Sequence, residues 1–206
     1  VWVDASKYSA ASPSILTNYG VGGRALNASF AGGASSPIYI PHTGTNYFYA
    51  PGTNSNNVVV ADSAATSITG DMEVVMRLSM PDWTPATDKY LEGKRSTAAS
   101  ATYGRSWLGG VNTTGKHIFY WSSNGLTETL LTSASTPPLT DGTTYWIKRI
   151  FDADNGTGGN TVSFYWAPDS TTEPTTWNFF GSGTQASPIA TIWNSNAPVT
   201  VNGWSD

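Results

Sequence analysis

The stretch ADSAATSITGDMEVVMRLSMPDWTP, residues Ala61 to Pro85, decides the fold class of this chain. From Met72 to Met80 every even-numbered position is apolar, while the odd-numbered positions include Glu73, Arg77 and Ser79. Successive side chains of a strand point to opposite faces, so this alternation is typical of a strand with one buried face. The Thr-Gly-Asp corner before it and the Asp-Trp-Thr-Pro loop after it supply turns. The stretch therefore predicts a strand in a sheet that is buried on one side.

The rest of the chain repeats this scheme of short strands and turns. Gly, Pro, Asn or Asp occupies nearly every gap between apolar segments, and no window of a dozen residues has helical periodicity. A single helical turn is predicted at Ser63–Ser67. The other predicted strands are Val1–Val3, Ile38–Ile40, Tyr47–Tyr49, Asn57–Val60, Lys89–Glu92, Ser106–Leu108, His117–Trp121, Glu128–Thr132, Thr144–Phe151, Thr161–Trp166, Trp177–Phe180, Thr191–Trp193 and Val199–Val201.

The segment Asp141–Asp169 predicts a long β-hairpin. In its first strand one face carries Trp146, Lys148 and Ile150, and the residues between them lie on the other face. In its second strand the side chains of Val162, Phe164 and Trp166 share one face. Three glycines in the intervening loop provide the positive φ angles of a tight reversal. Large aromatic side chains on these and other strands are expected to fill the core, namely Phe119, Trp146, Phe164 and Trp166.

Length and composition favour one β-sandwich domain over residues 1–206. The chain has 206 residues, and its 9 Trp, 10 Tyr and 7 Phe can fill a two-sheet core. Residues 1–43 are expected to hold leading strands with connections rich in Ser, Ala and Gly, and residues 44–206 the main core. Because there is no cysteine, disulfides and thiolate metal sites are excluded. The chain opens on Val1 without a leader sequence, and we expect it to be a piece of a longer protein.

The charge pattern argues against nucleic acid as a partner. The net charge is −4, and the ten Lys and Arg residues are scattered, whereas binding to a phosphate backbone needs a basic stripe. No apolar run approaches the roughly 18–20 residues that span a bilayer, so membrane insertion is not expected either.

Several phrases along the chain resemble one family of jelly-roll domains. They span roughly residues 44–202 and are Tyr47–Gly52, Asp62–Asp71, Asp82–Pro85, Asp141–Trp146, Asp152–Tyr165 and Ile192–Pro198. In this order they resemble the laminin-G/concanavalin A-like domain of bacteriophage minor tail proteins, particularly of phages that infect actinobacteria. The resemblance implies an all-β sandwich of two antiparallel sheets.

The resemblance also implies a setting for the protein. It suggests a non-enzymatic module on the virion surface, with other virion proteins and a host cell-surface glycan as partners. The fold alone does not decide this, since lectins, glycan-degrading enzymes and passive adhesion modules share it.

The alternative is a glycoside hydrolase acting on host polysaccharide. Such enzymes on this fold carry two or three carboxylates on one strand. The one acidic residue two positions from a Glu here is Asp71, before Glu73, and it belongs to the Thr-Gly-Asp corner, where a turn-capping role is expected. The best remaining pair is Glu73 with Glu128, with Arg77 positioning the substrate. The two histidines, His42 and His117, lack metal-ligand spacing and are expected at the surface or half-buried.

Two candidate binding sites remain. Asp152 and Asp154, with Asn160 at the end of the same Gly-rich loop, offer oxygen ligands for calcium, although simple stabilisation of the hairpin turn is the preferred explanation. Aromatic rings stack on sugar faces, and Arg binds hydroxyl groups. Gly/Ser/Thr-rich loops hold or border four residues of these types, and we predict a carbohydrate site formed by Tyr103, Arg105, Trp107 and Trp177.

Overall fold

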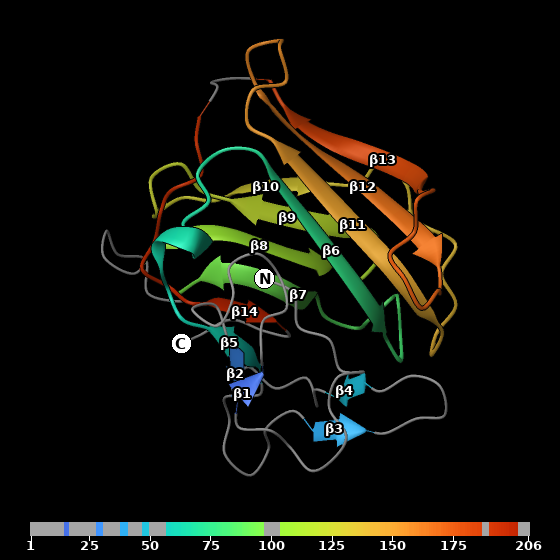
Figure 1. Ribbon diagram of the computed structural model, residues 1–206. Helices are drawn as coiled ribbons and strands as arrows, with labels where there is room; N and C mark the ends of the chain where they lie inside the picture. The colour runs from blue at the N-terminus through green and yellow to red at the C-terminus, as the bar shows by residue number, and fades with distance from the viewer. Residues whose placement is uncertain are drawn as a thin grey trace.

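The protein is a β-sandwich of jelly-roll type built from two antiparallel sheets (Figure 1). The computed structural model describes residues 57–96, 104–186 and 190–201, together with the short strands at 15–16, 28–30, 38–40 and 47–49. These residues form strands, turns and one 3₁₀ helix, Ala64–Thr66, at the place where the sequence predicts a helical turn. None of the described residues belongs to a helix that could cross a membrane.

The larger sheet has eight strands, and the last strand of the chain lies inside it. This strand, β14, pairs with β5 on one side and with β7 on the other. The order across the sheet is β1 (Ile15–Leu16), β2 (Ala28–Phe30), β5 (Val58–Val60), β14 (Val199–Val201), β7 (Lys89–Arg95), β8 (Arg105–Val111), β9 (His117–Trp121) and β10 (Thr129–Thr132).

The smaller sheet contains the strand that opened the sequence analysis. Its order is β13 (Asn178–Gln185), β12 (Asn160–Pro168), β11 (Thr144–Asp152) and β6 (Met72–Ser79). The predicted hairpin is β11–β12, with Lys148 opposite Tyr165. Strand β6 pairs with β11, which follows it only after four strands of the other sheet, and places Met76 opposite Ile147. A separate ribbon joins β3 (Ile38–Ile40) to β4 (Tyr47–Tyr49).

The core lies between the two sheets, as the alternating pattern predicts. Phe151 of β11 stacks against Phe119 of β9, with ring centroids 5.7 Å apart, and this contact joins the sheets. Phe119 and Phe164 are fully buried, and Trp166 is partly buried against the core. Trp146 points to the opposite face of the smaller sheet, so its predicted place in the core is wrong although its side chain is buried.

Two glycines let β13 approach the edge strand of the other sheet. A Cβ atom on Gly183 would lie 2.9 Å from the backbone nitrogen of Thr132, and one on Gly181 would lie 2.6 Å from that of Ala134. Gly181 also has φ of 131°, a conformation that side chains disfavour. These glycines therefore close the sandwich along β10.

The predicted strand Thr191–Trp193 is wrong. This segment makes isolated backbone hydrogen bonds, from Ile192 to the Thr69 carbonyl and from Trp193 to the Ser122 carbonyl, and so joins two loops without entering a ladder. Its apolar character has another cause, because Ile192 is buried in the core. The predicted strand Val1–Val3 lies outside the described residues.

Candidate functional site

The outer face of the smaller sheet, turned away from the larger sheet, carries a group of aromatic side chains around one lysine. Tyr145, Ile147 and Phe151 of β11 point into the core, so Lys148 between them points outward. Its ammonium nitrogen lies 4.4 Å from the ring centroid of Trp177 and 5.4 Å from that of Tyr165. These distances are those of cation–π contacts. The lysine is therefore held between two aromatic rings.

A third ring extends this group toward the edge of the sheet. Phe179 of β13 lies opposite Tyr165, with ring centroids 5.4 Å apart, and 58% of its surface is exposed. An apolar ring so exposed on a strand contributes little to the core and leaves a flat surface in solvent. We call Lys148, Tyr165, Trp177 and Phe179 the aromatic patch.

Hydroxyl and carboxylate groups border the aromatic patch. Beyond Tyr165 and Phe179 the outer face of β12 and β13 continues as two facing pairs of hydroxyl residues, Ser163 with Ser182 and Thr161 with Thr184. The two threonine hydroxyls are hydrogen-bonded at 3.1 Å. On the other side, Glu73 of β6 lies 3.8 Å from the ammonium group of Lys148. The rings of the aromatic patch are thus bordered by hydroxyl groups on one side and by a carboxylate on the other.

The connection between β12 and β13, residues 169–177, lies across this face and positions Trp177. Arg77 of β6 holds Asp169 in a two-point ion pair with distances of 2.6 and 3.0 Å. The indole of Trp146 donates to the Ser170 carbonyl at 3.0 Å. These contacts bury Trp146 beneath the connection and bring Trp177 over Lys148.

The structure does not bring the four predicted sugar-binding residues together. Trp107 is 5% exposed and packs in the core beside Phe119, so its ring is not accessible for stacking on a ligand. Trp107 lies in the predicted strand Ser106–Leu108, but its prediction as a ligand contact failed because this strand, β8, is buried along nearly all its length. Tyr103 lies outside the described residues. Only Trp177 lies in the aromatic patch, whose other members were not predicted.

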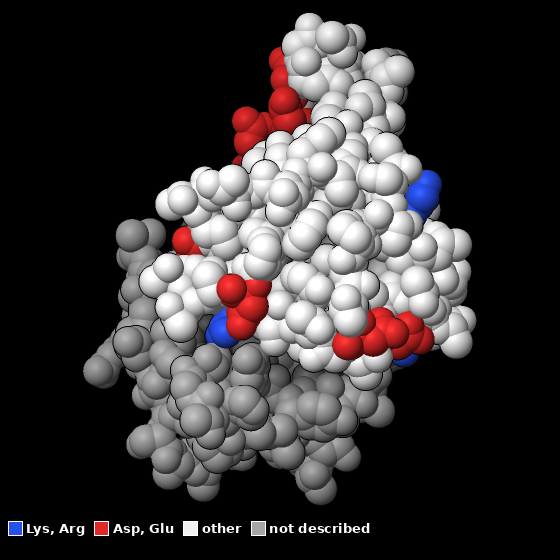
Figure 2. Space-filling model, turned by 90° about the vertical axis from the view of Figure 1, so that its right-hand side faces the viewer, with Lys and Arg blue, Asp and Glu red and all other residues white. Residues whose placement is uncertain are grey.

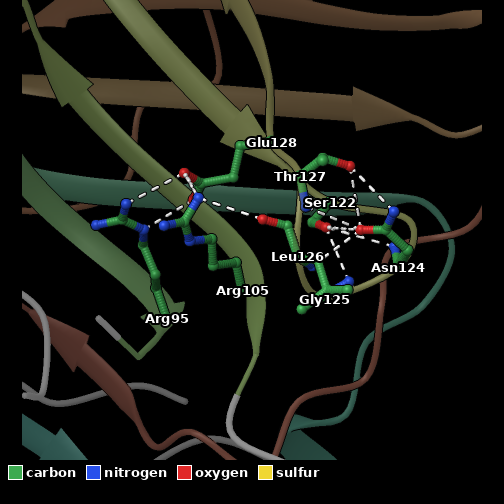
Figure 3. A network of polar contacts seen from close by, with 8 residues as sticks. All are labelled: Arg95, Arg105, Ser122, Asn124, Gly125, Leu126, Thr127 and Glu128. Atoms are coloured by element: carbon green, nitrogen blue, oxygen red, sulfur yellow. Dashed lines mark hydrogen bonds and ion pairs between the residues drawn. The ribbon is translucent and has the colours of Figure 1, made fainter. Parts of the chain in front are cut away.

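Arg105 belongs to a separate ionic group at the start of β8 and β10 (Figure 3). Its Nη1 lies 3.2 Å from Glu128 Oε2, while Arg95 Nε lies 2.7 Å from Glu128 Oε1. The adjoining turn is fixed by Asn124, whose side-chain oxygen accepts from the backbone nitrogens of Leu126 and Thr127, each at 2.9 Å. Glu128 is therefore held by two guanidinium groups.

The candidate catalytic pair is divided between the sheets. Glu73 lies on the outer face of β6 beside Lys148, whereas Glu128 precedes β10 in the larger sheet. Glycoside hydrolysis needs both carboxyl groups on one glycosidic bond. The third residue, Arg77, is already paired with Asp169. The geometry gives this alternative no support.

The loop predicted to hold calcium is organised by its own backbone. Asp152 accepts from the Asp154 nitrogen, and Asp154 accepts from the Gly156 nitrogen, each at 3.1 Å. Asn160 is fully buried and donates to the Ala153 carbonyl at 2.6 Å. Among the described residues no group of three or more His, Cys, Asp and Glu side chains could share a metal ion. The observed contacts are those of a hairpin turn.

A charged group lies in the middle of the sandwich and was not predicted. Arg149 of β11 contacts Glu92 of β7 at 2.5 Å and donates to the Gly110 carbonyl at 3.1 Å. It also lies 3.2 Å from Nδ1 of His117 on β9. A guanidinium group has only donors, so Nδ1 is the acceptor and the neutral ring carries its proton on Nε2.

Burial governs the ionisation of this group. It raises the pKa of Glu92, against the effect of the Arg149 charge and hydrogen bond. Burial and the charge of Arg149 also hold the pKa of His117 well below its usual 6.5. The expectation of an exposed or half-buried His117 is wrong, because the ring is fully buried. All three side chains lie inside the molecule, so they stabilise or specify the fold and do not meet a ligand from solvent.

The surface charge is sparse. On the side of the molecule shown in Figure 2, most of the described surface is uncharged, and the Lys, Arg, Asp and Glu side chains lie toward its margins.

Comparisons with known proteins add no family to this description. No protein-family model matches the chain, and no curated protein matches it.

Proposed function

We propose that this protein is a non-enzymatic module that binds a saccharide on the outer face of its smaller sheet. The observation that carries the proposal is the aromatic patch, in which Tyr165, Trp177 and the exposed Phe179 surround Lys148. The faces of a sugar ring are apolar and its edges carry hydroxyl groups. Aromatic rings with a border of polar groups provide contacts for both.

The resemblance of the sequence to phage tail domains supports a location for this activity. A module on the virion surface meets the host cell envelope, which is rich in saccharides. We propose the virion surface as its location, and host glycan and other virion proteins as its partners. In this role the protein holds the saccharide without cleaving it.

Retention on immobilised polysaccharides tests the proposal. We expect the protein to bind at least one member of a panel of neutral and acidic polysaccharides and to release no soluble fragments. Phe179→Ala and Trp177→Ala should each weaken retention. Leu130→Ala is the matched control, since Leu130 is also an exposed apolar residue, 46% exposed, but lies in the larger sheet.

Two results would contradict the proposal. One is the absence of retention on every polysaccharide at high protein concentration, which would leave only a structural role. The other is retention that Leu130→Ala weakens as strongly as Phe179→Ala, since binding would then not depend on the aromatic patch.

A further inference from the structure

Lys148 differs from the other paired cations of the described structure in lacking a hydrogen-bonded carboxylate. Its ion pair with Glu73 is 3.8 Å long, which is beyond hydrogen-bond distance, and no described residue accepts a hydrogen bond from its ammonium group. The side chain is nevertheless only 15% exposed. The other cations with an ionic partner each have a carboxylate oxygen within 3.2 Å, and they are Arg77, Lys94, Arg95, Arg105 and Arg149.

Lys148 is held by two aromatic rings and is only weakly paired with a carboxylate. The rings of Trp177 and Tyr165 attract a cation through their faces but accept no strong hydrogen bond. Glu73 is 49% exposed, so solvent screens it and its attraction for Lys148 is weak. An ammonium group with three donors is thus fixed beside an apolar surface, and its nitrogen is not among the buried polar atoms of the described residues, so a ligand can reach it.

From this geometry we propose that the saccharide bound at the aromatic patch is acidic, with a carboxylate or phosphate group contacting Lys148. This inference rests on the proposed function and names its ligand class. An anionic group on the ligand could approach Lys148 more closely than Glu73 does and accept a charge-assisted hydrogen bond from it. The rings beside it would contact the sugar that carries the charge.

The net charge of −4 does not oppose this specificity at short range. At physiological ionic strength the Debye length is about 8 Å, so distant carboxylates are largely screened. A contact with Lys148 is shorter than this length and is screened much less. The nearest carboxylate, Glu73, is the one whose removal should strengthen binding of an anion.

Two matched pairs of oligosaccharides test the proposal by titration calorimetry. Galacturonic acid oligomers are compared with galactose oligomers of equal length, and phosphorylated mannan fragments with unmodified ones. These pairs isolate the carboxylate and the phosphate. We expect the acidic member of at least one pair to bind more tightly, and the pair that responds identifies the anionic group.

Substitutions then assign the preference to Lys148. Lys148→Met should weaken binding of the acidic oligomer by roughly ten- to a hundredfold, the effect of a lost hydrogen bond to a charged group. It should change binding of the neutral oligomer much less. Glu73→Gln should strengthen acidic binding about two- to fivefold. Lys89→Met, which removes an exposed lysine of β7, is the control and should change neither affinity.

The outcomes separate this inference from the proposed function. If neutral and acidic members bind equally and Phe179→Ala weakens both, the saccharide site stands and the acidic specificity is refuted. A preference for acid that persists in Lys148→Met also refutes it. If neither member of either pair binds and the polysaccharide panel shows no retention, both proposals fail.

Discussion

Removing one partner of the buried pair between Arg149 and Glu92 should destabilise the protein much more than removing both. Arg149→Met leaves the Glu92 carboxylate buried at 2% exposure without its cation. Breaking such a pair costs about 3–5 kcal/mol. In a domain of this size about 1 kcal/mol lowers the melting temperature by 2–4 °C, so we expect a fall of roughly 6–20 °C.

The double variant Glu92→Leu with Arg149→Met should recover most of this loss. In the wild-type protein Glu92 Oε2 and Arg149 Nε are buried without hydrogen-bond partners, so the ion pair does not fully offset its own desolvation. Replacing both charges by apolar side chains removes that deficit. We expect the double variant to lie within about 1 kcal/mol of the wild type or above it.

Urea denaturation of the wild type, both single variants and the double variant gives the coupling energy directly. Arg77→Met is the control, because its partner Asp169 is 39% exposed, and it should cost no more than about 1 kcal/mol. The reasoning is refuted if Arg149→Met costs less than about 1 kcal/mol, or if the double variant loses the sum of the two single losses.

Three further predictions concern pH, packing and metal. Because the pKa of His117 is held well below 6.5 in the folded state, the unfolded chain takes up a proton first as the pH falls. The contribution of His117 to stability should therefore decrease below pH 6.5, by at most about 1.4 kcal/mol per pH unit. His117→Gln should remove this slope in urea denaturation between pH 7.5 and 5.5, and a slope lost instead in His42→Gln would contradict the assignment. Gly109→Ala places a Cβ atom 1.9 Å from Glu92 Oε1 and should cost about 1–3 kcal/mol by overpacking, so a melting temperature equal to that of the wild type would show that the pair can move aside. The melting temperature should be the same in excess chelator and in millimolar calcium, because one oxygen of each loop carboxylate already accepts from a backbone N–H group and shapes the turn. A rise with calcium that Asp154→Ala abolishes would overturn this expectation.

Local sequence patterns determined the strands and the fold class. The alternation from Met72 to Ser79 and along β12 places the correct side chains toward the core, because the two-residue period of a strand depends only on its own residues. In β11 the same period did not show which face is the inner one, and Trp146 was assigned to the wrong face. Gly, Pro, Asn and Asp predicted where the connections between strands lie. The strand Val199–Val201 was predicted at its observed bounds.

The site depended on contacts between segments far apart in the chain. The aromatic patch needs Lys148, Tyr165, Trp177 and Phe179 to meet on one face. The connection at residues 169–177 is held on that face by contacts from distant residues, Arg77 to Asp169 and Trp146 to Ser170. Trp107 was predicted to contact a ligand, but it lies in the core. Strand β8 pairs with β7 and β9, and the ring of Trp107 is buried between the sheets.

The alternating pattern of a strand did not predict the buried ionic group of Glu92, His117 and Arg149. Glu92, His117 and Arg149 come from three strands of two sheets, and each occupies an inward position that the alternating pattern reserves for an apolar side chain. A charge at such a position is tolerated when a partner of opposite charge reaches it, and here Glu92 of one sheet meets Arg149 of the other. The sequence alone therefore determined most of the strands and the alternation of side chains along them. The packing of one sheet on the other decided which face lay inside, which charges met there and which aromatic rings remained in solvent.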